Sequence, residues 1–403
     1  MQSPSFDDAK TAFASKSDEQ LKNARFIFEC MTKPWLVRLG LRLTPLALKF
    51  GLPVKGIIRR TIFSQFVGGE TLEDTSTVVE NLAKFNVKVI LDYGVEGKEG
   101  EKEFDHAADE FIRVIDYAAT QPNIPYMSIK LTGLSRFSLL EKVNHVAVYS
   151  DIVRGKVAFD KLDENEKAEW KRVVARLTKI CSAAAKYNVG VLIDAEESWI
   201  QYAEDALATM MMMRFNTQKP VIFNTAQLYR HDRLQYIRDF CSFAKQNNFI
   251  PAMKLVRGAY MEKERARAEE MNYPSPINAT KTDTDNEFNA AVAFCLSPEN
   301  NMHIVIGSHN EYSNLLATQI MKKLGLPLND PRIHLSQLYG MSDNITFNLA
   351  KAGCNASKYL PFGPIKDVIP YLMRRAQENS SVSSQTRREL QLIEKELKRR
   401  RNS

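Results

Sequence analysis

The sequence contains few of the residues that build disulfide frameworks or metal centres. Its five cysteines lie far apart with no Cys-x-x-Cys pair, and the chain has only six histidines. An odd, scattered set of cysteines is typical of reduced thiols in a reducing compartment. Neither His-x-His nor His-Glu-x-x-His occurs. The sequence therefore argues against both a disulfide scaffold and a metal-dependent hydrolase.

Several other signals are absent. There is no Walker motif, no Gly-x-Gly-x-x-Gly after a strand and no Gly-x-Ser-x-Gly. These absences disfavour a P-loop, a Rossmann site and a serine-hydrolase elbow. No uninterrupted apolar run approaches the roughly 18 residues of a membrane span. The N-terminus carries Asp7 and Asp8 before any apolar run, which fits neither a secretory signal nor a transit peptide.

The composition is that of a globular protein with a sizeable core. Of the 403 residues, 44% are apolar and 26% are charged, and the 55 basic and 48 acidic residues leave a net charge of +7. One segment, residues 35–66, has no Asp or Glu but interleaves apolar residues with Arg38, Arg42, Lys49, Lys55, Arg59 and Arg60. Such a segment either lies on an anionic membrane surface or forms basic helices packed on the outside of the domain.

Short β-prone runs alternate with longer helical stretches along most of the chain. The predicted strands are Val87–Leu91, Met127–Leu131, Gly190–Ile193, Val221–Asn224, Ala252–Val256, His303–Ile306, Ile333–Leu335 and Lys358–Leu360. Helices are predicted over Glu164–Tyr187, Ser198–Arg214, Arg233–Asn247 and Asn310–Leu324. Strands separated by helical crossovers pair in parallel. We therefore expect an α/β fold, a (βα)8 TIM-like barrel, with a doubly wound open sheet as the alternative.

Three parts of the chain are expected from this pattern. Residues 1–60 form a helical N-terminal arm, residues 61–380 the barrel and residues 381–403 a basic C-terminal tail. Residues 263–288 read as a polar excursion after the fifth strand. In the tail, the spacing of Leu390, Ile393 and Leu397 suggests a frayed amphipathic helix, but a solvated tail is the interpretation preferred here.

Polar residues gather where the predicted strands end, which is where barrel enzymes place their chemistry. These residues are Lys130, Asp194, Asn224, Lys254, Ser308, His309, Ser336, Gln337 and Tyr359. A single such residue is usually part of a salt bridge. Seven strand ends carrying polar groups to one rim favour a binding site, because leaving those groups unsatisfied would be costly.

The segment after the last strand has the sharpest pattern. Gly363-Pro364 is expected to open a helix, because Pro is tolerated in the first turn. One face of this helix carries Tyr371, Arg374, Arg375 and Glu378. Two arginines beside a tyrosine can bind a carboxylate while the ring packs against the ligand's apolar side. The alternative is an exposed basic helix end.

Taken in order, these motifs resemble the proline dehydrogenase family. The match rests on Ser128-Ile-Lys-Leu-Thr, Ile193-Asp-Ala-Glu-Glu, Lys254-Leu-Val-Arg-Gly-Ala-Tyr, Gly307-Ser-His-Asn, Tyr359-Leu-Pro-Phe-Gly-Pro and Tyr371-Leu-Met-Arg-Arg-Ala-Gln-Glu-Asn. It covers roughly residues 60–380. Each motif is weak alone, whereas the ordered set, one motif per strand, is highly specific.

The resemblance implies a distorted (βα)8 barrel that binds FAD without a covalent link. L-proline would be oxidised to Δ1-pyrroline-5-carboxylate, and the electrons would pass to a membrane quinone. Because no aldehyde dehydrogenase segment follows, a monofunctional enzyme is expected. It would lie at the cytoplasmic face of a bacterial inner membrane or the matrix side of the mitochondrial one, with peripheral membrane contact and no nucleic acid partner.

The resemblance also implies roles for individual residues. Substrate binding would involve Lys130, Arg374 and Arg375 on the carboxylate, and Leu338, Tyr359 and Tyr371 around the ring. Asp194 and Lys254 would be catalytic, with Lys254 near flavin N5. The remaining cofactor contacts would be Gln227, Val256, Gly258, Tyr260, Ser308, His309, Gln337 and Glu378.

Two positions depart from the family pattern. Many bacterial members have Arg where this chain has Lys254, so Arg257 is a rival for the contact with N5. The family's Thr-His pair is Ser308-His309 here, which keeps the hydroxyl. Two alternatives to proline oxidation remain: an FAD enzyme for hydroxyproline or another cyclic amino acid, and a non-catalytic basic barrel that binds lipid or RNA.

Overall fold

The computed structural model describes residues 4–49, 54–94, 99–381 and 383–402, and within them every side chain except those of residues 45–49, 378–381, 383 and 384. The chain divides into two compact units. The first comprises Met1–Gly94 and Ser336–Ser403, and the second comprises Val95–Leu335.

Eight strands follow one another in chain order around a closed barrel. They are β1 (Lys88–Tyr93), β2 (Tyr126–Ile129), β3 (Gly190–Ile193), β4 (Ile222–Gln227), β5 (Ala252–Val256), β6 (His303–Gly307), β7 (Ile333–Leu338) and β8 (Ala356–Phe362). The pairings of β1 with β8 and of β2 through β6 are parallel. The predicted (βα)8 barrel is confirmed, and the open sheet is wrong.

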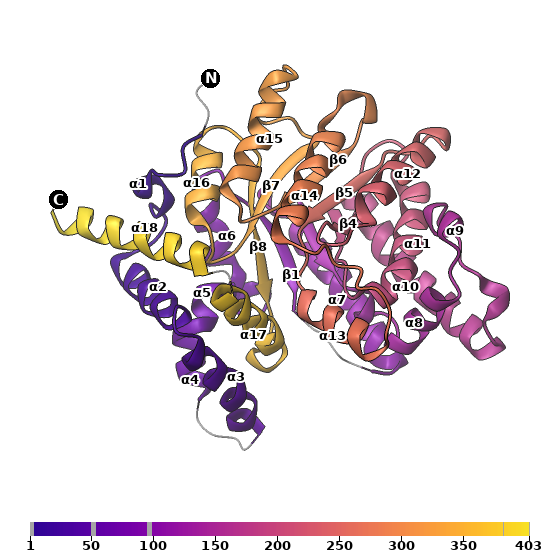
Figure 1. Cartoon of the computed structure of the whole chain (residues 1–403), viewed down its shortest axis with the longest axis horizontal. Coiled ribbons are helices and arrows are strands. Elements are labelled where there is room, and N and C mark those ends of the chain that lie inside the picture. The colour runs from indigo at the N-terminus through magenta and orange to yellow at the C-terminus, as the bar shows by residue number, and fades with distance from the viewer. Residues whose placement is uncertain (1–3, 50–53, 95–98, 382, 403) are drawn as a thin grey trace. The chain divides into compact units, whose positions relative to one another are not determined.

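The second unit contains the crossover helices that the sequence predicts, and Figure 1 shows them beside its strands. The four predicted helices are α10 (Glu164–Tyr187), α11 (Ser198–Phe215), α12 (Arg233–Gln246) and α15 (Glu311–Lys323). The unit also contains α7 (Glu101–Ala119), α8 (Phe137–His145), α9 (Tyr149–Val153), α13 (Met261–Glu270) and α14 (Lys281–Leu296), which the sequence analysis did not predict individually. α10 begins with a capping box between Asp163 and Glu166 and ends at Asn188 in the left-handed conformation. Residues 263–288 are not one loop, because most of α13 and the start of α14 lie within them.

The first unit holds the helices from both ends of the chain. They are α1 (Ala9–Ala12), α2 (Asp18–Met31), α3 (Pro34–Lys49), α4 (Lys55–Ile58), α5 (Ser64–Phe66), α6 (Ser76–Ala83), α16 (Asp343–Lys351), α17 (Ile365–Ser381) and α18 (Ser383–Arg401). One core cluster joins side chains of α2, α17 and α18, among them Phe28, Tyr371 and Ile393. None of the helices in the described ranges is both long enough and apolar enough to cross a bilayer.

The C-terminal residues form a docked helix rather than a solvated tail. Leu392, Ile393 and Leu397 are buried, and α18 packs against α2 (Figure 1). Arg400 donates a hydrogen bond of 2.8 Å to the carbonyl of Phe13. The amphipathic spacing indicated the helix correctly, and the expectation of a solvated tail is wrong because this apolar stripe finds a partner in the N-terminal arm.

Candidate active site

The second unit places a buried ion pair at the carboxyl ends of β3 and β5. The Lys254 ammonium donates to the Asp194 carboxylate, which also accepts a hydrogen bond from the Ser128 hydroxyl. Successive side chains of a strand point to opposite faces, so Lys254 and Val256 share one face of β5 while Arg257 lies on the other. The structure thus brings two of the predicted catalytic residues into direct contact.

The ionisation of Asp194 is set by its neighbours. Burial disfavours the charged carboxylate, but the positive charges of Lys254 and Lys130 outweigh it, so the pKa of Asp194 lies below its ordinary value. Asp194 is consequently an anion at neutral pH, and Lys130 acts on it from the end of β2. Lys130 itself is half-buried.

Glu196 is a functional candidate that the sequence analysis did not single out. Its carboxylate accepts hydrogen bonds from the Thr132 hydroxyl, at 2.8 and 2.9 Å, and from the Thr132 amide at 3.3 Å. Burial raises the pKa of Glu196 to about 7, against the opposing charge of Lys130. Burial also raises the pKa of Glu204, whose carboxylate accepts from the Glu196 amide at 3.2 Å. The sequence signal for Glu196 was its place in the motif Ile193-Asp-Ala-Glu-Glu, two residues after Asp194.

The predicted cofactor residues Gly258 and Gln227 lie beside an exposed stretch of main chain. Gly258 has φ +129°, and a Cβ there would come within 2.6 Å of the Tyr229 ring, so only glycine fits this position. Gly258 and its neighbour Ala259 are exposed. The Gln227 amide is fixed beside them: its nitrogen donates to the Glu196 carbonyl at 2.6 Å, and its oxygen accepts from the Ala259 amide at 3.4 Å. Val256 and Tyr260 are half-buried on the same segment.

Arg257, the rival of Lys254, points to the helices outside the barrel. Its guanidinium donates to the carboxylate of Asp285 at 2.7 Å and to the hydroxyls of Ser308 and Ser313 at 2.8 and 2.9 Å. The Ser308 hydroxyl also accepts from the Asn310 amide. This geometry favours Lys254 over Arg257 as the cation at the barrel rim. His309 follows β6 and is half-buried.

In the first unit, α17 carries the predicted carboxylate-binding arginines. The Arg375 guanidinium lies over the Tyr371 ring, 5.2 Å from its centroid. Each of these two side chains is 7% exposed, so Arg375 is not part of an exposed basic helix end. Arg374 is half-buried. Tyr371 belongs to the core cluster, and Leu338 packs against that cluster.

Three further predicted residues belong to this unit. Tyr359 is the half-buried residue of β8, an otherwise buried strand. The Gln337 amide oxygen accepts a hydrogen bond of 2.7 Å from the Thr346 hydroxyl of α16. Glu378 falls in α17, but its side chain lies outside the described residues. The assignment of Glu378 to the cofactor therefore stays a prediction.

The family model for proline dehydrogenase matches residues 75–388. The chain belongs to the proline dehydrogenase family. The sequence-based recognition is confirmed, and with it the prediction of an oxidoreductase of proline catabolism.

Individual relatives agree with this. The chain is 31% identical to proline dehydrogenase 1, mitochondrial, of Dictyostelium discoideum, over 98% of this chain and 74% of the relative. It is 35% identical to the carbapenem antibiotics biosynthesis protein CarD of Pectobacterium carotovorum, over 93% and 94% of the two chains. It is 30% identical to the hydroxyproline dehydrogenase of Xenopus laevis, over 96% and 88%.

A solved structure shares the fold. Proline utilization A from Bdellovibrio bacteriovorus superposes with a TM-score of 0.68 at 19% identity, over 92% of this chain. The chain spans 38% of the length of that protein. The likeness therefore concerns the fold of most of this chain and less than half of the longer protein.

Proposed function

We propose that this protein oxidises L-proline to Δ1-pyrroline-5-carboxylate with FAD as its bound cofactor, and that the electrons pass to a membrane quinone. The observation that carries the proposal is the packing of the Arg375 guanidinium over the Tyr371 ring in α17, with both side chains 7% exposed. A guanidinium suits a carboxylate because it can donate two parallel hydrogen bonds. The ring beside it offers apolar surface to a small cyclic substrate.

In this proposal, charged side chains bind the carboxylate of proline, and apolar and aromatic side chains contact its ring. Arg374, Arg375 and Lys130 bind the carboxylate of proline, and Leu338, Tyr359 and Tyr371 surround its ring. Fixing a carboxylate by several cations leaves the ring little rotational freedom, and orientation of this kind contributes strongly to rate. The substrate loses a hydride from C5 and a proton from nitrogen, which leaves a C=N bond.

The residues present are compatible with FAD. The open main chain at Gly258 and Ala259, where a Cβ at Gly258 would strike the Tyr229 ring, lets a flat polar group approach the backbone. Gln227, with its amide already oriented, would hold the pyrimidine edge, and Lys254 would lie near N5. When bound, the flavin supplies the hydride acceptor. Ser308, His309, Tyr260 and the other predicted contacts complete this assignment.

The protonation state of the substrate is controlled by the same cations. Proline must lose its ammonium proton before a hydride can leave. Lys130, Lys254 and the arginines create a positive environment that disfavours the ammonium, which Asp194 offsets in part. Activity is therefore expected to rise with pH until the bound amine is neutral.

The exposed face of α3 is suited to an anionic membrane. Trp35, Leu39 and Leu43 occur at i, i+4 and i+8 and are 65%, 45% and 52% exposed. Arg38 and Arg42 flank this stripe and are exposed as well. An apolar stripe beside a basic one can enter the lipid headgroup region, where a quinone is accessible. Several relatives are named as mitochondrial, and an inner membrane is the corresponding location proposed here.

A second candidate is oxidation of hydroxyproline. It is favoured by the similarity to the hydroxyproline dehydrogenase of Xenopus laevis, which covers 96% of this chain. The two functions would share the barrel, the cofactor and the carboxylate clamp, formed by Lys130, Arg374 and Arg375. They would differ in whether the ring wall, formed by Leu338, Tyr359 and Tyr371, accommodates the hydroxyl group of hydroxyproline.

Substrate comparison tests the proposal. We would measure the flavin content of the purified protein and its kcat/KM for L-proline, trans-4-hydroxy-L-proline and L-pipecolate with a soluble quinone analogue. Proline is expected to be preferred by about tenfold or more, about 1.4 kcal/mol. A preference for hydroxyproline would favour the second candidate. A flavin-free protein that FAD cannot reconstitute would contradict both.

A further inference from the structure

Lys358 is a buried lysine in β8, directly before the ring-wall residue Tyr359. Its side chain is 1% exposed, and burial lowers the pKa of its ammonium, against the favourable charge of Asp343. A lysine is seldom fully buried unless it is paired. Neither the carboxylate clamp nor the flavin site described above uses this group.

All three N–H groups of the Lys358 ammonium find acceptors in one turn. They donate to the Asp343 carboxylate at 2.7 Å, to the Met341 carbonyl at 2.6 Å and to the Leu338 carbonyl at 3.5 Å. The turn joins β7 to α16 and begins at Leu338, another ring-wall residue. A backbone hydrogen bond of 2.9 Å from the Tyr339 amide to the Tyr359 carbonyl fixes the same turn to β8.

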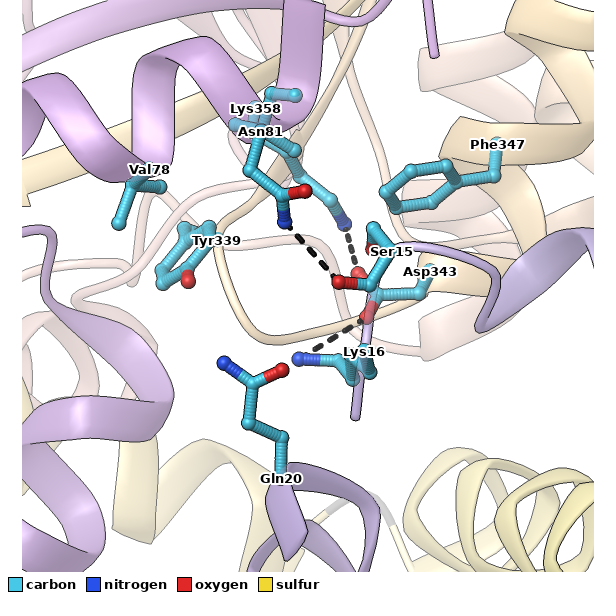
Figure 2. Close-up of a pocket in the computed structure, with 10 residues that line it drawn as sticks. Ser15, Lys16, Gln20, Val78, Asn81, Tyr339, Asp343, Phe347 and Lys358 are labelled. Carbon is cyan, nitrogen blue, oxygen red and sulfur yellow. Dashed lines mark hydrogen bonds and ion pairs between the residues drawn. The ribbon is translucent and has the colours of Figure 1, made fainter. Parts of the chain in front are cut away.

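Figure 2 shows Asp343 between two lysines that reach it from opposite directions. Lys16, from the N-terminal arm, lies 3.5 Å from the second carboxylate oxygen. Burial disfavours the Asp343 carboxylate, but the charges of Lys358 and Lys16 keep its pKa below the ordinary value. Lys16 shares the carboxylate, whereas only Lys358 of the two also donates to the carbonyls of the turn.

The turn needs external support because its backbone is strained. Ser342 has φ +51°, a left-handed conformation that non-glycine residues seldom adopt. The Ser342 amide donates to the Glu389 carboxylate of α18 at 2.9 Å. Gly340 has φ +79°, and a Cβ there would come within 1.9 Å of the Gln65 carbonyl oxygen. The strained conformation of Ser342 persists only because surrounding contacts hold it in place.

We propose that Lys358 is a positioning residue for substrate binding: by tying the 338–343 turn to β8, its ammonium sets the separation of Leu338 and Tyr359. This inference rests on the proposed proline oxidation and deepens it. Of these two residues, Leu338 carries one of the carbonyls that accept a hydrogen bond from Lys358, and Tyr359 follows Lys358 directly in β8. Lys358 touches neither substrate nor cofactor and acts through these neighbours.

The test removes the ammonium without leaving a buried anion. Lys358→Met alone removes one of the two lysines that pair with the buried Asp343 carboxylate and leaves only Lys16, at 3.5 Å, so this variant can fail to fold. The double variant Lys358→Met with Asp343→Asn carries neither charge and nearly preserves both side-chain volumes. We expect its KM for proline to rise about tenfold, with kcat and flavin content within about twofold of wild type. A wild-type KM in the double variant would overturn the role of Lys358.

Two comparisons separate positioning from general stability. Lys16→Met removes the other cation of Asp343 but leaves the turn carbonyls bonded, so melting temperature is expected to fall and KM to stay unchanged. A KM increase in Lys16→Met equal to that of the double variant would overturn the inference. Lys351→Met is the matched control, an exposed lysine of α16 paired with Asp8 at 2.9 Å.

A ligand without a ring gives a second readout. Lactate presents a carboxylate to Arg374 and Arg375 but has no ring for the wall to contact. Its inhibition constant is expected to stay within about twofold of wild type in the double variant, and a parallel tenfold loss would mean that the clamp itself had moved. Wild-type protein without proline turnover would contradict the proposed function, whereas normal turnover with an unchanged KM in the double variant would contradict only this inference.

Discussion

The Lys254 ammonium and the Asp194 carboxylate form a buried ion pair that joins the carboxyl ends of β5 and β3. Ser128 donates to the same carboxylate, and Lys130 contributes a second positive charge. The pair and Lys130 therefore place two positive charges and one negative charge at the rim, where we propose that the flavin and the substrate bind. Breaking a buried pair by removing one partner is strongly unfavourable, because the other charge stays behind.

Removing the cation from this pair is expected to impair the chemical step. Lys254→Met leaves the Asp194 carboxylate with less positive charge, so the pKa of Asp194 rises, and it removes the cation proposed near N5. We expect kcat to fall about 100-fold, roughly 2.7 kcal/mol, with a smaller change in KM. Steady-state kinetics with a quinone analogue measures both constants. Lys263→Met is the control, since Lys263 pairs with Glu197 but is 61% exposed, and an equal loss of kcat in both variants would contradict the role of Lys254.

Removing the buried arginine is expected to impair substrate binding instead. Arg375→Met deletes a charge-assisted contact to the carboxylate of proline, which is worth roughly 2 kcal/mol and corresponds to a rise in KM of about 30-fold. The flavin content is expected to stay unchanged. Arg387→Met, at an exposed arginine of α18, is expected to behave as wild type. Unchanged proline affinity in Arg375→Met would count against the clamp.

The fold was predictable because it depends on local pattern. All eight β-prone runs are strands, and Glu164–Tyr187 is α10 with the bounds predicted. Strand ends were placed less well: β8 begins two residues before Lys358, at Ala356. The prediction missed Ala356 and Ser357, which are buried in β8, because a short run with polar residues such as Ser357 and Lys358 lacks the continuous apolar pattern of a buried strand.

The candidate site was predictable only in part. The strand-end pattern and the family resemblance indicated Asp194 and Lys254, but not that they contact each other. Glu196 was not singled out because its importance comes from burial and from Thr132, a contact across two strand ends. The ion pair of Asp343 and Lys358 could not be predicted from the sequence for the same reason. The fold brings these two residues together, and their spacing along the chain does not indicate the contact.

Glu196 is expected to make stability depend on pH. Its pKa is about 7 in the folded chain against 4.5 ordinarily. The protonated acid thus favours the fold, and this stabilisation is complete below pH 4.5 and is lost as the pH rises through about 7. Glu196→Gln cannot ionise, so its melting temperature relative to wild type is expected to increase from pH 5 to pH 8 by the equivalent of roughly 1–3 kcal/mol.

Melting curves at several pH values measure this difference. Glu262→Gln, at an exposed glutamate of α13, serves as the control. If the Glu196→Gln variant and wild type lose stability in parallel between pH 5 and pH 8, the ionisation of Glu196 does not act on the fold. Glu204, whose pKa burial also raises, would then be the next residue to replace.

The exposed stripe of α3 is expected to mediate membrane binding. Replacing Trp35, Leu39 and Leu43 together by Ser removes three exposed apolar side chains, and binding to anionic vesicles is expected to weaken by about 100-fold or more. Activity with a soluble quinone analogue is expected to persist. Vesicle co-sedimentation at low salt measures the first effect. Tyr312→Ser with Met271→Ser, which removes exposed apolar side chains from the second unit, is the matched control, and equal partitioning of both variants would argue against the α3 surface.

Anaerobic addition of L-proline to the purified, FAD-containing protein tests the central claim most directly. The account predicts that proline bleaches the visible absorbance of the bound flavin and that a quinone analogue restores it, with the Arg375→Met variant requiring much more proline for the same bleaching. A flavin spectrum that proline leaves unchanged at any concentration, in protein that is folded and fully loaded with FAD, would contradict it.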